Sequence, residues 1–210
     1  MSQRDKIIQI AAEQIGYKER NNNLTKFGAW YGMDGSPWCA MFVSWCAAQA
    51  GIPTNIVPKL SYVPNMVDFF KRRGLYKPRG YLPKKGDIVF FGSSSHVGLV
   101  EGATKDAVFT IEGNTASEGN VSNGDGVYRR SRTLGAGSWV MGYGVPEYEE
   151  DEDEMKRWMT LSDVPAGYYR QQAERLIGEG VLKGKEDGTL DITEDMLRTI
   201  LVVERIIKAQ

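Results

Sequence analysis

Cys39 is the residue of this 210-residue chain whose type and position best suit nucleophilic chemistry. It follows Pro37-Trp38 and begins CAMFVSWCAAQA, a segment so apolar that it predicts a helix buried on nearly all sides. Unpaired N–H groups at a helix start favour a thiolate and can hold an oxyanion. Cys46 lies further along the same predicted helix, about 10 Å away, too far for a disulfide. We interpret Cys46 as an inert core residue; for Cys39, plain packing is the alternative.

His96 is the only histidine, so a Cys–His pair must use it. It lies between Ser93-Ser94-Ser95 and the predicted strand HVGLVEG, where its side chain can project toward a helix end; an exposed turn histidine is the alternative. A third residue must hold the imidazole in one tautomer. Glu112 and Asn114, which end the next predicted strand AVFTIEGN, are the candidates. Glu101 is disfavoured, because it lies toward the far end of the hairpin.

Helices are predicted before the strands that would carry these residues. The first runs from Ser2, a good N-cap, to Gly16, the second begins at Cys39, and the third spans Val63 to Arg73. Short β-type runs then follow Lys85, and the two around Ala103–Asp106 predict a hairpin. These runs are GDIVFFG, HVGLVEG, AVFTIEGN, GVYRRS and SWVMGYGVP. Helices followed by an antiparallel sheet define an α+β class.

Bulk composition excludes several kinds of partner. A net charge of −1 gives no electrostatic argument for binding nucleic acid or a membrane surface. No apolar run approaches the roughly 20 residues of a membrane span. The N-terminus lacks the apolar block of a secretory signal, so a cytoplasmic protein with two reduced thiols is expected.

An acidic block after Pro146 suggests a division of the chain. Residues 147–154 include seven carboxylates, and a run of like charge repels itself and does not pack into a core. We therefore predict a domain over 1–146, an acidic linker over 147–155 and a second, helical unit over 156–210. An acidic start to the next helix is the alternative interpretation.

Three separated motifs then point to a known family. PWCAMFVSW, GDIVFFG with HVGLVEG, and TIEGN occur in the order that resembles the CHAP family, the cysteine- and histidine-dependent amidohydrolases/peptidases of peptidoglycan. The resemblance covers about residues 1–146 and implies a papain-like α+β domain. It implies Cys39 as nucleophile, His96 as base, Glu112 as orienting residue and Asn114 as a polar residue of the catalytic site. The Cys–His–His wall peptidases are a poor match, because a second histidine is lacking.

Neither a metal nor another cofactor is expected. Some members of this family carry an Asp-rich calcium loop before the cysteine, but here TKFGAWYGMDGSPWC offers only Asp34, and calcium takes six to eight oxygen ligands. Aromatic side chains near the motifs, Trp30, Tyr31, Trp38 and Trp139, are candidates for a substrate groove or for the core. Of these, Trp38 is predicted to bind substrate.

The C-terminal segment resembles a single surface-layer homology module. The matching elements are Ser162-Asp163-Val164-Pro165, the helix through Leu176, Gly180–Gly184 and Asp187–Leu190. The resemblance implies anchoring to secondary polymers of a Gram-positive wall. However, Thr193-Glu194-Asp195-Met196 stands where the family usually has Thr-Arg-Ala-Glu, so the expected basic residue is missing.

Such modules also commonly act in sets of three, and a unit of about 50 residues has a marginal core. We therefore expect wall attachment, alone or through a homo-oligomer. A dimerising or solubilising helical pair is the alternative.

Together these features predict a peptidoglycan hydrolase, with N-acetylmuramoyl-L-alanine amidase favoured and endopeptidase as the alternative. A catalytic domain without an export signal fits a phage endolysin that a holin releases to the wall, and an autolysin is the alternative origin. A non-catalytic wall-binding protein is a second interpretation, although a pure binder needs neither Cys39 nor His96. An intracellular cysteine protease or acyltransferase is a third.

Overall fold

The computed structural model describes residues 1–119, 123–149, 158–185 and 189–208. These belong to two units, Met1–Glu149 and Glu150–Gln210, each with its own buried core. Of the predicted acidic linker 147–155, positions 150–155 lie outside the described residues. None of the helices that the structure describes is long and apolar enough to cross a membrane.

Four helices form the N-terminal layer of the first unit. They are α1 (Gln3–Ala12), α2 (Lys26–Tyr31), α3 (Cys39–Gln49) and α4 (Val63–Arg72). Ser2 caps α1 as predicted, accepting a hydrogen bond from the Asp5 N–H at 3.1 Å, but α1 ends at Ala12 and the chain then turns before Gly16. Helix α2 was not predicted, because six residues that include a glycine show no clear period.

The second layer is a single six-stranded sheet. Its strands are β1 (Tyr76–Pro78), β2 (Ile88–Phe91), β3 (His96–Ala103), β4 (Ala107–Thr115), β5 (Gly126–Thr133) and β6 (Val140–Gly144). They lie in the order β1-β6-β2-β3-β4-β5, and all neighbours are antiparallel. The α+β class and the β3–β4 hairpin are confirmed, whereas the three-residue β1 was not predicted.

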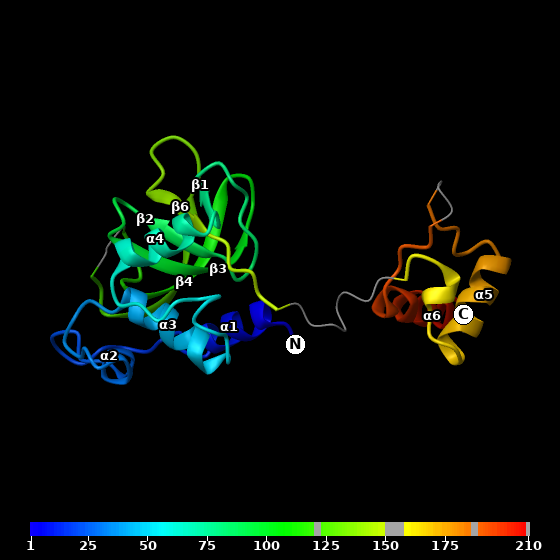
Figure 1. Cartoon of the computed structure of the whole chain (residues 1–210), viewed down its shortest axis with the longest axis horizontal. Coiled ribbons are helices and arrows are strands. Elements are labelled where there is room, and N and C mark those ends of the chain that lie inside the picture. Colours follow the sequence, from blue (N-terminus) through cyan, green and yellow to red (C-terminus); the bar gives the residue numbers. More distant parts are fainter. Residues whose placement is uncertain (120–122, 150–157, 186–188, 209–210) are drawn as a thin grey trace. The chain divides into compact units, whose positions relative to one another are not determined.

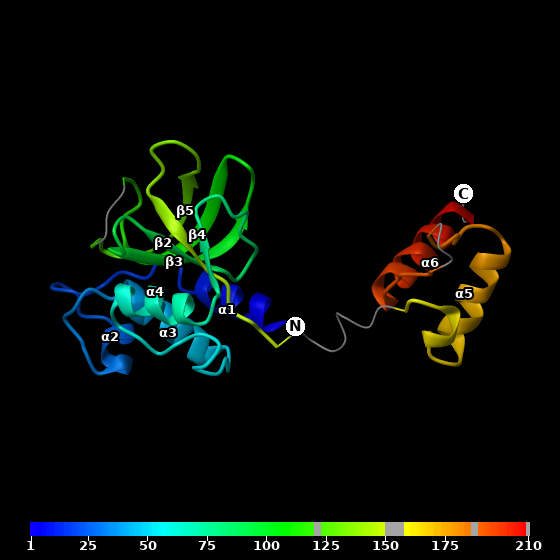
Figure 2. The same ribbon diagram turned by 45° about the horizontal axis from the view of Figure 1, so that its top comes forward.

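The helices lie together on one side of the sheet (Figures 1 and 2), where α3 packs against β3 and β4. Gly113 permits this contact, because a Cβ atom there would lie 2.6 Å from Cγ of Phe42. Side chains alternate along a strand, so Glu112 points to the other face of β4. That face carries a separate apolar cluster, which includes Phe91 and Val108.

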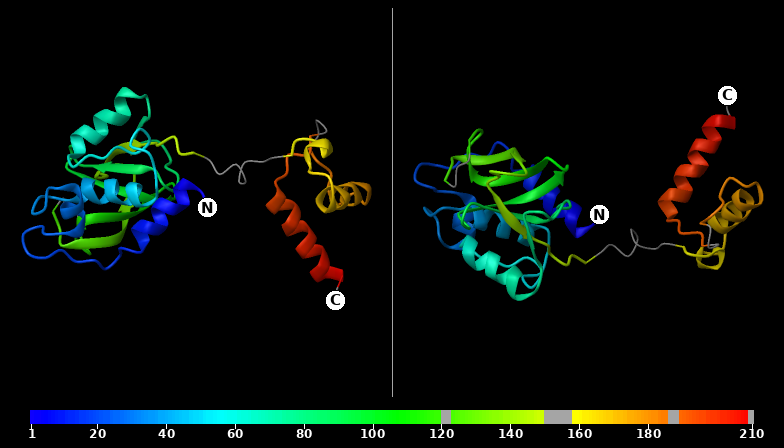
Figure 3. Two further views of the ribbon diagram at one scale, coloured as in Figure 1. Left: turned by 60° about the horizontal axis from the view of Figure 1, so that its bottom comes forward. Right: turned by 90° about the horizontal axis from the view of Figure 1, so that it is seen from above.

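The second unit contains a 3₁₀ turn, η1 (Leu161–Asp163), and two helices, α5 (Tyr168–Gly178) and α6 (Glu194–Lys208). The helices lie beside one another (Figure 3). Thr193 caps α6 by accepting from the Met196 N–H at 3.2 Å. The buried residues of the unit are Trp158, Val164, Ala173, Leu176, Leu182, Leu190, Ile192, Leu197 and Leu201.

Candidate active site

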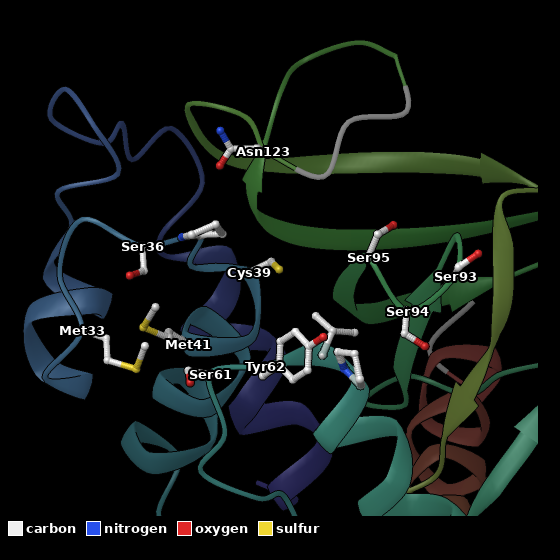
Figure 4. Close-up of a pocket in the computed structure, with 13 residues that line it drawn as sticks. Met33, Ser36, Cys39, Met41, Ser61, Tyr62, Ser93, Ser94, Ser95 and Asn123 are labelled. Carbon is white, nitrogen blue, oxygen red and sulfur yellow. The ribbon is translucent and has the colours of Figure 1, made fainter.

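Cys39 is the first residue of α3 and lines a cleft of about 650 Å³. Figure 4 shows it between Met33 and Met41 on one side and the Ser93–Ser95 turn on the other, with Tyr62 nearby. Only 4% of Cys39 is exposed, so the thiol is open to a substrate in the cleft but little hydrated. The helix start supplies backbone N–H groups at the same position.

His96 begins β3 and is completely buried. Its Nε2 lies 3.0 Å from Oε2 of Glu112, on the neighbouring strand β4. Its ring stacks on Phe91 and Trp139, with centroid distances of 5.6 and 5.7 Å. The carboxylate and the two rings fix the imidazole, as a catalytic base requires.

The other ring nitrogen of His96, Nδ1, has no hydrogen-bond partner among the described residues. Cys39 is nevertheless close enough to act on the imidazole. Burial lowers the pKa of His96, but interactions with Cys39 and then with Glu112 outweigh burial and raise the pKa to about 9. An imidazole that interacts with a cysteine at a helix start is the arrangement that a cysteine nucleophile and its base require.

Glu112 is held by more than the imidazole. Thr110 Oγ1 donates to its Oε1 at 2.6 Å, and Arg132 donates through Nε to Oε1 at 3.0 Å and through Nη2 to Oε2 at 2.6 Å. Burial raises the pKa of Glu112, but His96 and Arg132 outweigh burial and lower the pKa to about 2. Gly98 makes room for this carboxylate, because a Cβ there would lie 2.7 Å from Cγ of Glu112. Arg132, which sequence analysis missed, therefore belongs to the site.

Asn114 binds the backbone of Trp38, the residue before Cys39, and not the imidazole. It is buried at φ +56°, and its amide is satisfied when the oxygen accepts from the Trp38 N–H at 3.1 Å and the nitrogen donates to the Gly124 carbonyl at 2.9 Å. Trp38 is the N-cap of α3. Asn114 thus fixes the backbone that leads into Cys39, while Glu112 orients His96.

Trp38 takes a different position from the one predicted. Its ring is completely buried, stacks on Phe27 with a centroid distance of 5.2 Å, and donates through Nε1 to Glu19 at 2.8 Å. With no exposed face, the ring packs the core and does not contact substrate, which corrects the prediction. Tyr62, 61% exposed, is the aromatic side chain that lines the cleft. Its type and loop position gave no signal in the sequence.

Metal ligands are not gathered anywhere in the part of the chain that the structure describes, where no three His, Cys, Asp or Glu side chains lie close enough to hold an ion. The Asp34 carboxylate, weighed above as a calcium ligand, accepts from the backbone N–H groups of Thr25 at 2.7 Å and Gly35 at 3.2 Å. These hydrogen bonds use the Asp34 carboxylate to hold the backbone of the loop that precedes Cys39.

Comparison with known proteins gives one family match. Residues 30–114 match the family described as the CHAP domain, a range that includes Cys39, His96, Glu112 and Asn114 but not Arg132. No curated protein matches the chain.

The solved structures that are similar to it include the following two. One is a mutated form of RipA, the Resuscitation Promoting Factor Interacting protein, which is 20% identical with a TM-score of 0.42; 70% of this chain and 62% of that chain are covered. The other is Ly7917, 16% identical with a TM-score of 0.41, and 68% of this chain and 62% of that chain are covered. This chain thus covers less than two thirds of either protein.

Proposed function

We propose that the first unit is a cysteine-dependent hydrolase that cleaves an amide bond of peptidoglycan, and that N-acetylmuramoyl-L-alanine amidase is the favoured activity. The CHAP match over residues 30–114 supports the substrate class. The observation that carries the proposal is the placement of Cys39 at a helix start on an open cleft, within interaction distance of a His96 that Glu112 anchors.

The reaction would proceed in two halves. The Cys39 thiolate attacks the amide carbonyl carbon, a C–S bond forms, and N–H groups at the start of α3 bind the oxyanion. His96 gives its proton to the nitrogen as the C–N bond breaks, and the amine leaves. His96 then takes a proton from water, the water oxygen attacks the thioester, and the new carboxylate leaves as the thiolate is restored.

Digestion of purified Gram-positive peptidoglycan, followed by mass spectrometry of the released fragments, tests this proposal. We expect the wild-type protein to release stem peptides that begin with L-alanine, because an amidase cuts between the lactyl group and that residue. Cross-bridge or stem fragments would replace the amidase by an endopeptidase of the same mechanism. Binding to the wall with no fragment released would overturn the hydrolase and favour a wall-binding protein.

We also propose that the second unit associates with further copies of itself through α6. A groove of about 440 Å³ is lined there by Val181, Ile200, Val203 and Ile207 among others, and Ile207 is 66% exposed. Exposed apolar patches of this kind mark interaction sites. The carboxylates in the groove, Glu179 and Glu204, pair with Arg175, which disfavours an anionic wall polymer and favours a second apolar helix face.

Replacing Val203 by glutamate should shift the full chain toward monomer in sedimentation velocity, by at least about tenfold in dissociation constant, because a buried charge disfavours association. Val202→Glu is the matched control, since Val202 is exposed on the same helix but does not line the groove. A wild-type protein that stays monomeric at high concentration, or equal effects of both substitutions, would contradict the proposal.

A further inference from the structure

Arg132 is a buried charged side chain to which the proposed reaction gives no step. It lies on β5, is 4% exposed, and falls outside the residues that match the CHAP family. Arginine is rarely buried unless it is paired. The ion pair with Glu112 accounts for its burial, and we ask next what this pair does for the site.

We infer that Arg132 is a positioning residue for the proposed hydrolysis, which fixes the plane of the Glu112 carboxylate and thereby aims the imidazole of His96 at Cys39. The inference rests on the proposed function. It assigns to Arg132 no contact with substrate.

The geometry of the Arg132–Glu112 pair supports this role. Two hydrogen bonds, Nε to Oε1 at 3.0 Å and Nη2 to Oε2 at 2.6 Å, hold the guanidinium and the carboxylate in a bidentate arrangement. Oε2 is also the atom that lies 3.0 Å from Nε2 of His96. Rotation of the carboxylate would therefore break the contact that orients the imidazole.

Arg132 is itself fixed by the surroundings of His96. Its Nη1 donates to the Gly119 carbonyl at 2.8 Å. Its guanidinium carbon lies 5.0 Å from the ring centre of Trp139 and 5.4 Å from that of Phe91, the two rings that also stack on His96. Phe91 and Trp139 thus contact both His96 and Arg132, the two charged side chains that bind the Glu112 carboxylate.

The charged groups around Glu112 come from several elements. His96 faces it from β3 and Arg132 from β5, and Cys39 of α3 acts on it through His96. Arg130 interacts with it at longer range, while Glu118 acts on Arg130. Burial raises the pKa of Glu112, whereas His96 and Arg132 lower it. Without Arg132, the effect of burial is opposed mainly by His96. Loss of Arg132 therefore raises the pKa of Glu112.

Arg130 provides a matched control. It lies two residues away on β5 and, like Arg132, donates to the Gly119 carbonyl, at 2.6 Å. It also donates to the Ala116 carbonyl, but no hydrogen bond joins it to Glu112 among the described residues. Arg130→Met and Arg132→Met therefore remove the same side-chain type from the same strand, and only the second releases Glu112.

The test is the dependence of kcat/KM on pH, from pH 3 to 8, with peptidoglycan fragments as substrate and folding checked by circular dichroism at each pH. For Arg132→Met we expect an acidic limb at higher pH than in the wild type, because Glu112 then takes up a proton at higher pH. Arg130→Met should keep the wild-type profile.

Arg132→Lys keeps the charge without the bidentate geometry, and it serves also if Arg132→Met does not fold. We expect it to keep the wild-type acidic limb with kcat lowered about tenfold to a hundredfold, because the carboxylate is less well aimed. If Arg132→Lys has the kcat and kcat/KM of the wild type at every pH, or if Arg132→Met shows no acidic limb at higher pH than the wild type, the inference about Arg132 is wrong. Neither result would contradict the proposed hydrolase activity. A wild-type protein that releases no fragments would instead remove the proposed function.

Discussion

Cys39→Ala should lower kcat/KM for peptidoglycan by at least about a thousandfold, whereas Cys46→Ala should keep activity within about threefold of the wild type. Both cysteines lie on α3 and both are buried, so the two variants change the same side chain in the same helix. Only Cys39 lines the cleft and interacts with His96. Alanine at position 39 leaves no atom to attack the carbonyl.

Alkylation by iodoacetamide gives an independent readout of the same difference. Burial raises the pKa of the Cys46 thiol well above its usual range, so Cys46 stays protonated and unreactive in the folded protein. We expect peptide mapping to find the label on Cys39 first, with loss of activity in step. Equal labelling of both cysteines, or a Cys39→Ala protein that keeps a tenth of the wild-type activity, would rule out Cys39 as the nucleophile.

The elements that carry Cys39 and His96 could be predicted because local signals define them. The apolar run after Pro37 marks α3, and the segments HVGLVEG and AVFTIEGN mark a hairpin through their short connection. A hairpin fixes which residues face each other, so a histidine at the start of one strand and a carboxylate near the end of the next must come close. This pairing is why the sequence favours Glu112 over Glu101 as the partner of His96.

Arg132 escaped prediction because its position depends on pairing across a long connection. Alternation places Arg130 and Arg132 on one face of β5, but it does not give the register with β4. In the structure Arg132 stands opposite Val108, while Glu112 stands opposite Tyr128. The long guanidinium side chain reaches along the strand to the carboxylate, a contact that no local pattern reveals.

Trp38 shows the same limit for burial. An aromatic residue next to a nucleophile suggests a substrate contact, but whether its ring faces the cleft depends on what packs against it. Here Phe27, from the unpredicted helix α2, stacks on the ring and Glu19 binds its Nε1. The burial of the Trp38 ring was missed because its stacking partner lies on a helix that the sequence did not predict.

Glu112→Gln should lower kcat/KM by about a hundredfold to ten-thousandfold at pH 7, the range that general acid–base catalysis contributes. Glutamine has no charge to stabilise the imidazolium, and burial then lowers the pKa of His96 from about 9. A neutral imidazole has no proton to give to the leaving amine. The expected signature is therefore a loss in kcat with an alkaline limb shifted to lower pH.

The same substitution should lower the free energy of unfolding by about 3–5 kcal/mol, because it leaves the buried Arg132 without its counter-charge. Urea unfolding at pH 7 measures this loss. Glu101→Gln is the matched control, since Glu101 also makes a two-bond pair with an arginine, Arg129, but at the surface. We expect that control to cost less than about 1 kcal/mol and to leave activity unchanged.

The pH dependence of the free energy of unfolding tests whether Glu112 and His96 stabilise the fold as a charged pair. In the folded protein the pKa of His96 is raised from 6.5 to about 9. The stabilisation that protonated His96 contributes is therefore fully present below pH 6.5 and is lost as the pH rises through 9. The folded pKa of Glu112 is lowered from 4.5 to about 2, so its contribution is present above pH 4.5 and is lost as the pH falls through 2.

The free energy of unfolding of the wild type should therefore exceed that of Glu112→Gln by the largest amount between pH 4.5 and 6.5. The difference should narrow toward pH 9 as the imidazole loses its proton. Urea unfolding of both proteins at pH 5.5 and 9 measures the two gaps. A gap that stays constant over this range would mean that His96 is not held charged by Glu112. The carboxylate would then act on the fold through Arg132 alone, and the assignment of His96 as an anchored imidazolium beside Cys39 would fall.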